Sequence, residues 1–321
     1  MKLIIQIPCF NEENTLPEVI RDLPNLIAGI DEIEYLVIDD GSKDRTSAVA
    51  EELGVHHILK LGSNRGLAYA FSSGINYALE HGADIVVNTD GDNQYQGADI
   101  AKLVQPIVEG KSDLVVGSRN IKGHQEFGLT KKIFQMLGSW TLRKISKTEV
   151  RDAPSGFRAF SREVCLRIFI YSKFSYTMET LIQAGNSNLR VDSVEIGVNP
   201  KTRESRLFGN IFEHIYKSGF TIVNMFLLYR PGKFFYWVGN FFNLVALILG
   251  VRYFYLVFLT NNIDAERTYI PSLILLSITA FWGVLSYLLG VLGEIMKSNR
   301  KLSEEVNYNQ RKILFKQKKE D

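Results

Sequence analysis

The chain has 321 residues, of which 37 are Lys or Arg and 35 are Asp or Glu, so its formal net charge is +2. Its length suffices for one large domain or two of ordinary size. A charge so near zero argues against a protein that grips nucleic acid over a long basic surface. A hydrophobic content of 46% excludes a disordered chain.

Cysteine and histidine patterns indicate neither a zinc site nor a disulfide framework. Cys9 and Cys165 form no CxxC pair, and the five histidines show no HxxxH spacing. The apolar run at the N-terminus is interrupted at Asn11, too early for the core of a signal peptide. We expect this run to be the first strand and the N-terminus to stay in the cytoplasm.

Residues 1–200 alternate short apolar runs with helical stretches. Strands are predicted at Leu3–Ile7, Tyr35–Asp39, His57–Leu61, Ile85–Thr89, Leu114–Gly117 and Val191–Val198. Helices are predicted at Thr15–Ala28, Thr46–Leu53, Leu67–Glu80, Ile100–Glu109 and Lys131–Ile145. Strands separated by helices of this length predict one α/β domain with a mostly parallel sheet between helical layers.

Residues 201–232 form a second region. Its apolar side chains recur every four residues, at Leu207, Ile211 and Ile215 and at Phe208, Phe212 and Tyr216. This pattern predicts an amphipathic helix, and its place just ahead of a membrane segment favours an interfacial helix over a core-facing one.

Two apolar segments within residues 233–296 are each long enough to cross a bilayer. Phe234–Leu259 carries only the charge of Arg252, and Tyr269–Met296 only that of Glu294. Residues 297–321 form a basic tail. The positive-inside rule therefore predicts an integral protein of the cytoplasmic membrane with both termini and the α/β domain in the cytoplasm. We expect Arg252 to snorkel toward the outer loop, although a charge at membrane depth also raises the alternative of a functional site.

Polar clusters follow four predicted strands. They are Pro8–Glu13, Asp39–Asp44, Asp90–Gln94 and Gly117–Arg119. Ligands bind beyond the carboxyl ends of the strands in an open parallel sheet, so four clusters converging on one edge predict a site there.

The third cluster has the chemistry of a hard-cation site. Asp90 and Asp92 flank Gly91, and Gln94 adds a neutral oxygen. Oxygen ligands suit Mg²⁺ or Mn²⁺, which keep positions free for substrate phosphates. Tyr95 at the sixth loop position excludes an EF-hand, and neither glycine-rich phosphate motif is present.

The ordered motifs IPCFNEEN, YLVIDDGSKDRT, NRGLAYAFSSG, NTDGDNQ, VVGSR and RDAPSGFRAF resemble family 2 glycosyltransferases of the GT-A fold. Within that family they look most like the polyprenyl-phosphate branch, which includes dolichyl-phosphate mannose synthases and bacterial polyprenyl-phosphate glucosyltransferases. The resemblance covers roughly Lys2–Arg206. Phe10 stands where the family more often has Tyr, and Gly91 where it often has Ala.

The resemblance implies a role for each matching residue. It places the nucleotide sugar among Pro8, Phe10, Glu12, Asp39, Asp40, Asp90 and Gly91, and the metal on Asp90, Asp92 and Gln94. It assigns the acceptor side to Asp152, Ser155, Arg158 and Ser205, and the catalytic set to Asp92, Arg119, Arg158, Arg203 and Arg206. Two alternatives stay open: Asp39 could support its loop, and Asp152 could pair with Arg158.

The resemblance further implies an inverting transfer from a UDP- or GDP-linked sugar to undecaprenyl or dolichyl phosphate, assisted by Mg²⁺ or Mn²⁺. The expected partners are those two substrates and the lipid bilayer, without nucleic acid, and the chain is compatible with a homo-oligomer. The alternatives are a glycosyltransferase acting on another membrane acceptor, either a glycolipid or a polysaccharide, and a non-catalytic component of sugar-lipid transport.

Overall fold

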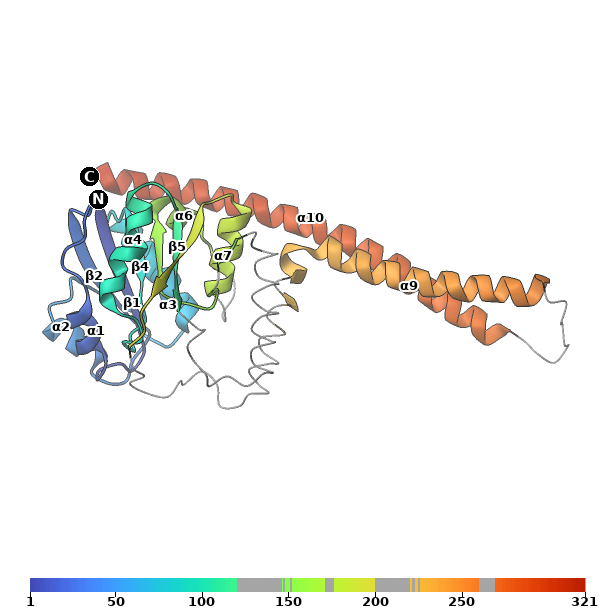
Figure 1. Cartoon of the computed structure of the whole chain (residues 1–321), viewed down its shortest axis with the longest axis horizontal. Coiled ribbons are helices and arrows are strands. Elements are labelled where there is room, and N and C mark those ends of the chain that lie inside the picture. Colours follow the sequence, from blue (N-terminus) through green and yellow to red (C-terminus); the bar gives the residue numbers. More distant parts are fainter. Residues whose placement is uncertain are drawn as a thin grey trace. The chain divides into compact units, whose positions relative to one another are not determined.

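The computed structural model describes residues 1–119, residues 146–170 apart from 147 and 151, residues 176–199, residues 220–259 apart from 221, 222 and 225, and residues 269–320. The chain splits into two compact units (Figure 1). The first comprises Met1–Gly219 with Glu304–Asp321, and the second comprises Phe220–Ser303. The first is an α/β unit and the second is built from two long helices.

The α/β unit is organised around one seven-stranded sheet of order β3-β2-β1-β4-β6-β5-β7. The strands are β1 (Lys2–Cys9), β2 (Glu32–Asp39), β3 (His57–Lys60), β4 (Ile85–Asn88), β5 (Leu114–Arg119), β6 (Arg158–Ser161) and β7 (Val191–Ile196). All pairs are parallel except those that β6 makes with β4 and β5. The predicted, mostly parallel α/β architecture is therefore confirmed.

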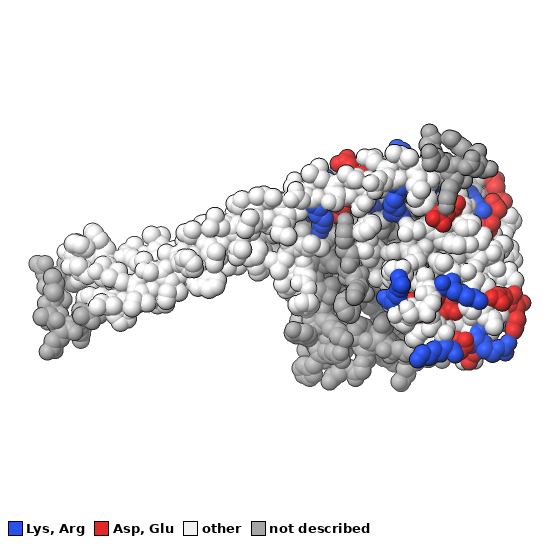
Figure 2. All heavy atoms as spheres, turned by 180° about the vertical axis from the view of Figure 1, so that it is seen from behind, with Lys and Arg blue, Asp and Glu red and all other residues white. Residues whose placement is uncertain are grey.

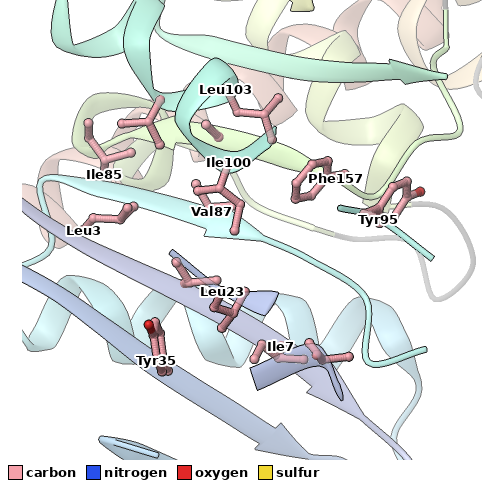
Figure 3. Packing of buried hydrophobic residues seen from close by; sticks show 14 of the residues in the cluster. Leu3, Ile7, Leu23, Tyr35, Ile85, Val87, Tyr95, Ile100, Leu103 and Phe157 are labelled. Carbon is pink, nitrogen blue, oxygen red and sulfur yellow. The ribbon is translucent and has the colours of Figure 1, made fainter. Parts of the chain in front are cut away.

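Helices cover both faces of this sheet. They are α1 (Leu16–Asp22), α2 (Thr46–Glu52), α3 (Leu67–Glu80), η1 (Gly97–Asp99), α4 (Ile100–Val108), α6 (Arg162–Arg167) and α7 (Tyr176–Asn186). Figure 3 shows Leu3 and Ile7 of β1 together with Val87, Ile100 and Leu103 in the core under α1 and α4. Alternate β1 residues such as Ile4 are equally buried on the other face, where α3 packs.

Two sequence predictions differ from the structure here. Helix α1 ends at Asp22 rather than Ala28, because Pro24 holds Leu23 in an extended conformation. The short strand β6 was not predicted, since its four residues include a buried arginine and show no alternating pattern. The predicted helix Lys131–Ile145 lies outside the described residues.

The second unit contains α9 (Pro231–Phe254), continued by the short π-helix η3 (Tyr255–Leu259), and the first part of α10 (Ile270–Glu320). Helices Pro231–Phe258 and Ile270–Phe315 each contain a stretch long and apolar enough to cross a membrane, and their most apolar windows have mean hydropathies of 1.9 and 2.0. Only 6% and 22% of their most apolar windows are buried, so neither resembles the core helix of a soluble protein. Figure 2 shows a nearly uncharged face along these helices.

Glycines bring the two long helices together. A Cβ on Gly239 would lie 2.8 Å from the ring of Tyr287 and 3.1 Å from the carbonyl oxygen of Gly283. The Tyr287 hydroxyl donates a 2.6 Å hydrogen bond to Oδ1 of Asn240. Small residues at such contacts let helix backbones approach closely, which is how helices associate where lipid removes the hydrophobic drive.

The C-terminal turns of α10 belong to the α/β unit and pack against α6 and α3. Arg311 donates to the carbonyl oxygens of Leu166 and Ile168 at 3.2 and 2.7 Å and to Oδ1 of Asn76 at 2.6 Å. The Tyr308 hydroxyl bonds the Glu163 carboxylate at 3.0 Å. The C-terminal part of the predicted basic tail is therefore helical and belongs to the folded α/β unit.

Candidate active site

The polar clusters meet at one edge of the sheet. Strands β1, β2, β4 and β5 run in the same direction, so their carboxyl ends lie together. Antiparallel β6 begins at that edge, and its first residue, Arg158, pairs in register with Asn88 of β4 and with Val116 of β5. The predicted convergence of the four loops is confirmed by this topology.

Asp39, the last residue of β2, and Asp40, which follows it, hold the loops around them. Asp39 accepts a 2.7 Å hydrogen bond from the backbone N–H of Ser42 and a second bond from the Ser47 hydroxyl. Asp40 accepts the backbone N–H groups of Arg65 and Gly66, both at 2.8 Å. Both carboxylates are therefore loop anchors, and the alternative in which Asp39 supports its loop fits this geometry.

A cavity of about 750 Å³ opens beside these anchors. Its lining residues include Phe10, Asp39 and, in the loop after β3, Gly62, Ser63 and Asn64. Volumes of this order accept a nucleoside or a drug-sized ligand. An aromatic ring with polar groups around it suits the stacking and edge-on recognition of a base.

The loop after β1 is tied to the turn after β4. The Thr15 hydroxyl lies 2.7 Å from the carbonyl oxygen of Gly91 and 2.9 Å from Oε2 of Glu12. A Cβ on Gly91 would lie 3.1 Å from Sγ of Cys9, so the turn passes close to the end of β1. Glu12 and the Asp90–Asp92 turn are thereby held next to each other.

The Asp90–Gln94 turn concentrates negative charge. The N–H of Gln94 donates a 3.2 Å hydrogen bond to Oδ1 of Asp92, which holds the turn together. Asn93 within the turn adopts the left-handed backbone conformation, with φ of +55°. Burial, and then the nearby charge of Asp92, raise the pKa of Asp90 to about 7, and Glu12 adds to the rise. Clustered carboxylates of this kind become favourable when a cation joins them.

The residue set fits a divalent cation that also binds substrate. No group of three or more His, Cys, Asp or Glu side chains arranged as a complete metal site occurs among the described residues. Asp90, Asp92 and Gln94 would hold Mg²⁺ or Mn²⁺ with few protein oxygens, and such ions take their remaining ligands from phosphates and water. The chemistry of these donors thus agrees with the predicted metal.

Arg119, at the end of β5, pairs with Asp152. Its Nε lies 2.7 Å from Oδ2 and its Nη2 lies 3.0 Å from Oδ1, a bidentate pair, while its backbone N–H bonds the same carboxylate at 3.2 Å. Asp152 is 1% exposed and the Arg119 side chain is 28% exposed. The expected alternative in which Asp152 pairs with Arg158 is therefore not the arrangement seen.

Arg158 lies behind this pair with no exposed surface. Its guanidinium donates to the carbonyl oxygens of Ser155, Ala153 and Thr177 and to the Thr180 hydroxyl. Burial lowers the pKa of Arg158 to about 10, still well above neutrality. Its predicted contact with an acceptor phosphate stays a prediction, and its geometry here is that of an internal brace.

The remaining predicted residues divide into buried ones and ones that lie outside the described part. Pro8 is buried within β1, and Ser155 is buried beside Arg158, whose Nε bonds its carbonyl oxygen. Arg203, Ser205 and Arg206 fall in residues 200–219, which are not described.

Sequence reasoning missed the polar side chains that support the edge from inside. Asn88 accepts a 2.9 Å bond from Gln6 and donates one of 2.9 Å to the carbonyl oxygen of Gly156. Gln6 and Asn88 interrupt otherwise apolar strands, and such an interruption in a fully buried strand was the available signal. Thr15 gave no signal beyond its place near a helix start.

This edge, with its nucleoside-sized cavity and acidic turn, is typical of enzymes that use nucleotide-activated substrates. The model for glycosyl transferase family 2 matches residues 4–169, and the chain belongs to this family. It is therefore a glycosyltransferase, and its fold is of the GT-A type.

Two named relatives and one solved structure show which proteins the chain is similar to. The chain is 34% identical over 212 residues to a UDP-N-acetylglucosamine–dolichyl-phosphate N-acetylglucosaminyltransferase of Methanococcus voltae, covering 59% of this chain and 82% of the relative. It is 28% identical to an undecaprenyl-phosphate mannosyltransferase of Micrococcus luteus, covering 66% and 89%. A glucosyl-3-phosphoglycerate synthase structure from Mycobacterium tuberculosis with Mn²⁺ and UDP shares the fold, with TM-score 0.54, 20% identity and coverage of 70% and 78%.

Proposed function

We propose that this glycosyltransferase moves a sugar from a nucleoside diphosphate onto a polyprenyl phosphate at the membrane, with inversion at the anomeric carbon. The observation that carries the proposal is a combination of two features in one chain. The edge of the sheet holds a nucleoside-sized cavity and an acidic turn, and two helices are long and apolar enough to cross a membrane. The relatives named for dolichyl and undecaprenyl phosphate support the acceptor class.

The donor side would hold the nucleotide. The base would enter the cavity beside Phe10, and the diphosphate would lie along the Asp90–Asp92 turn. Mg²⁺ or Mn²⁺ held by Asp92, Gln94 and Asp90 would supply neutralisation of the charge on the departing diphosphate. Relatives and fold neighbours that use UDP make UDP-sugars the first donors to test.

Arg119 would stabilise the leaving diphosphate. Asp152 occupies Nε and one terminal nitrogen of its guanidinium. In the described part of the chain, no hydrogen bond uses the other terminal nitrogen, which can donate to a diphosphate oxygen. A pre-oriented donor is more effective than a mobile one because it need not reorganise as charge develops.

The acceptor needs positioning rather than activation. A phosphomonoester has a second pKa of about 6, so at neutral pH it is already largely dianionic. Its oxygen can attack the anomeric carbon without losing a proton to a protein base. A single displacement of this kind inverts the anomeric centre and accounts for a site built from carboxylates and arginines.

The decisive experiment offers membranes containing the protein a panel of labelled UDP- and GDP-sugars, with Mn²⁺ or Mg²⁺ and undecaprenyl or dolichyl phosphate. We expect label in an acid-labile lipid, at least about 100-fold less with Asp92→Ala, and no change with the exposed control Asp192→Ala. Full activity of Asp92→Ala would remove the metal assignment. Label only in insoluble polymer would favour a polysaccharide synthase, and label in a phosphate-free lipid would favour a glycolipid synthase.

We also propose that the α/β unit faces the cytoplasm. Lys297, Arg300 and Lys301 follow the second apolar segment directly, which is the charge pattern of a cytoplasmic helix end. Single cysteines introduced at Lys301 and, separately, within residues 260–268 test this. A membrane-impermeant thiol reagent applied to intact cells should label only the cysteine within residues 260–268, and labelling at position 301 alone would reverse the orientation.

A further inference from the structure

Arg158 is the largest fully buried side chain in the protein's described part, and its contacts define what it does. Its Nε lies 2.8 Å from the carbonyl oxygen of Ser155, and its Nη2 lies 2.6 Å from that of Ala153. Its Nη1 reaches α7, at 2.6 Å from both the carbonyl oxygen of Thr177 and the Thr180 hydroxyl. The guanidinium therefore joins the backbone before β6 to the first turns of α7.

The backbone that Arg158 holds, residues 152–157, is called the acceptor-side segment below. It is fixed at several points besides Arg158. Nδ2 of Asn88 donates to the carbonyl oxygen of Gly156 at 2.9 Å, and the N–H of Gly117 donates to that of Phe157 at 2.8 Å. At its start, Asp152 forms the bidentate pair with Arg119. The segment thus connects β4, β5 and α7.

Gly156 brings this segment against the acidic turn. A Cβ there would lie 2.7 Å from the Tyr176 hydroxyl and 3.1 Å from Oδ1 of Asp90. The backbone of the segment is therefore packed directly on the Asp90 carboxylate. A shift of the segment by a few tenths of an ångström would move Asp90 at one end and the Arg119 pair at the other.

We propose that Arg158 is a positioning residue: it fixes the acceptor-side segment, and through it Asp90 and Arg119, without touching the acceptor phosphate. To reach a phosphate the guanidinium would have to leave four hydrogen-bond acceptors, three of them in fully buried bonds, and buried acceptors left without donors are costly. Its lack of exposed surface agrees with this role. The inference rests on the proposed function in one respect only, because the kcat and KM measured in its test are those of the proposed reaction.

The test separates the two roles by asking which binding event changes. Full-length Arg158→Lys in detergent is titrated with Mn²⁺ alone, then with UDP, and finally assayed with polyprenyl phosphate. A positioning residue predicts Mn²⁺ binding weaker by about tenfold, as found for residues that support metal ligands indirectly, with a lower kcat. The KM for polyprenyl phosphate should stay within about twofold, since interactions that act only on the reacting centre change kcat rather than KM. A phosphate ligand predicts the reverse, namely unchanged Mn²⁺ affinity and an acceptor KM raised about tenfold or more, and that result would overturn the proposal.

Two further variants serve as a second test and as a control. Thr180→Val removes one acceptor of Arg158 while leaving the arginine in place, and it should weaken Mn²⁺ binding in the same direction by a smaller factor. If Arg158→Lys fails to fold, Thr180→Val decides alone, and an unchanged Mn²⁺ affinity would refute the positioning role. Arg190→Lys, at an exposed arginine paired with Asp113, controls for the loss of a guanidinium. If the wild type makes no lipid product, the proposed function fails while the Mn²⁺ comparison still stands.

Discussion

The proposed donor and acceptor sides of the sheet edge are held by opposite chemistry. On the donor side, the carboxylates of Asp39 and Asp40 accept backbone N–H groups from loops that follow β2 and β3. On the acceptor side, the guanidinium of Arg158 donates to backbone carbonyls, and that of Arg119 to a buried carboxylate. The donor side can therefore be loosened by removing negative charge, and the acceptor side by removing positive charge or its partner.

The largest effect is expected from Asp152→Asn, which weakens the support of Arg119. The amide keeps the size of the side chain but can accept only one of the two guanidinium bonds, so the pair loses its bidentate geometry. We expect kcat to fall about 100-fold, comparable to the loss of one oriented donor at a charge-developing site. Binding of uridine, which lacks the diphosphate, should change little, because the donor-side anchors are untouched. Steady-state kinetics with a separate nucleoside titration measures both, and a kcat near that of the wild type would show that Arg119 needs no orientation by Asp152.

A smaller effect, confined to the donor side, is expected from Gly41→Ala. Gly41 has φ of +72°, and a Cβ there would lie 2.5 Å from the backbone carbon of Ser63. The matched control is Gly54→Ala, with φ of +68° and no atom within 4 Å of the added carbon. The control isolates the cost of the left-handed backbone, about 1–2 kcal/mol, and Gly41→Ala should cost more because the two loops must also separate. Chemical denaturation measures the free energy of unfolding of the two variants. Equal losses would mean that the two loops separate without an energetic cost.

The smallest effect is expected from Thr15→Val, which removes the hydroxyl between the Glu12 loop and the Gly91 carbonyl. The loss of one such bond lowers the free energy of unfolding by about 1 kcal/mol. Thr15→Ser keeps the hydroxyl and serves as the control. Because Thr15 holds the acidic turn from the donor side, Mn²⁺ affinity should fall slightly in Thr15→Val only. If Thr15→Val and Thr15→Ser bound Mn²⁺ equally well, the position of the acidic turn would depend on the acceptor-side contacts alone.

The difference between the two sides also explains what the sequence could predict. The donor side rests on short side chains close to the strand that carries them, so the DDGS run after β2 indicated both the turn and its place at the edge. Asp90 and Asp92 were equally readable, because their spacing in a turn after a buried strand follows from local geometry. These elements, and the parallel order of most strands, required only local patterns.

The acceptor side depends on partners that local patterns do not reveal. Arg119 and Asp152 are 33 residues apart, and Arg158 reaches Thr180 across 22 residues. An arginine in a motif is read as a phosphate ligand, whereas complete burial at the start of an antiparallel strand gives Arg158 a different set of contacts. Which charge pairs with which is decided by the insertion of β6 between β4 and β5, a strand too short to show a pattern.

The packing of Tyr308, Arg311 and the 4%-exposed Phe315 against the α/β unit has a practical consequence for producing that unit alone. A soluble version obtained by stopping the chain before α9 would discard these turns and uncover the surface of α6 and α3 beneath them. The unit defined by the fold is discontinuous in sequence. A soluble enzyme should therefore join Glu304–Asp321 back to the first segment through a flexible linker that replaces Phe220–Ser303, or supply those turns as a separate peptide.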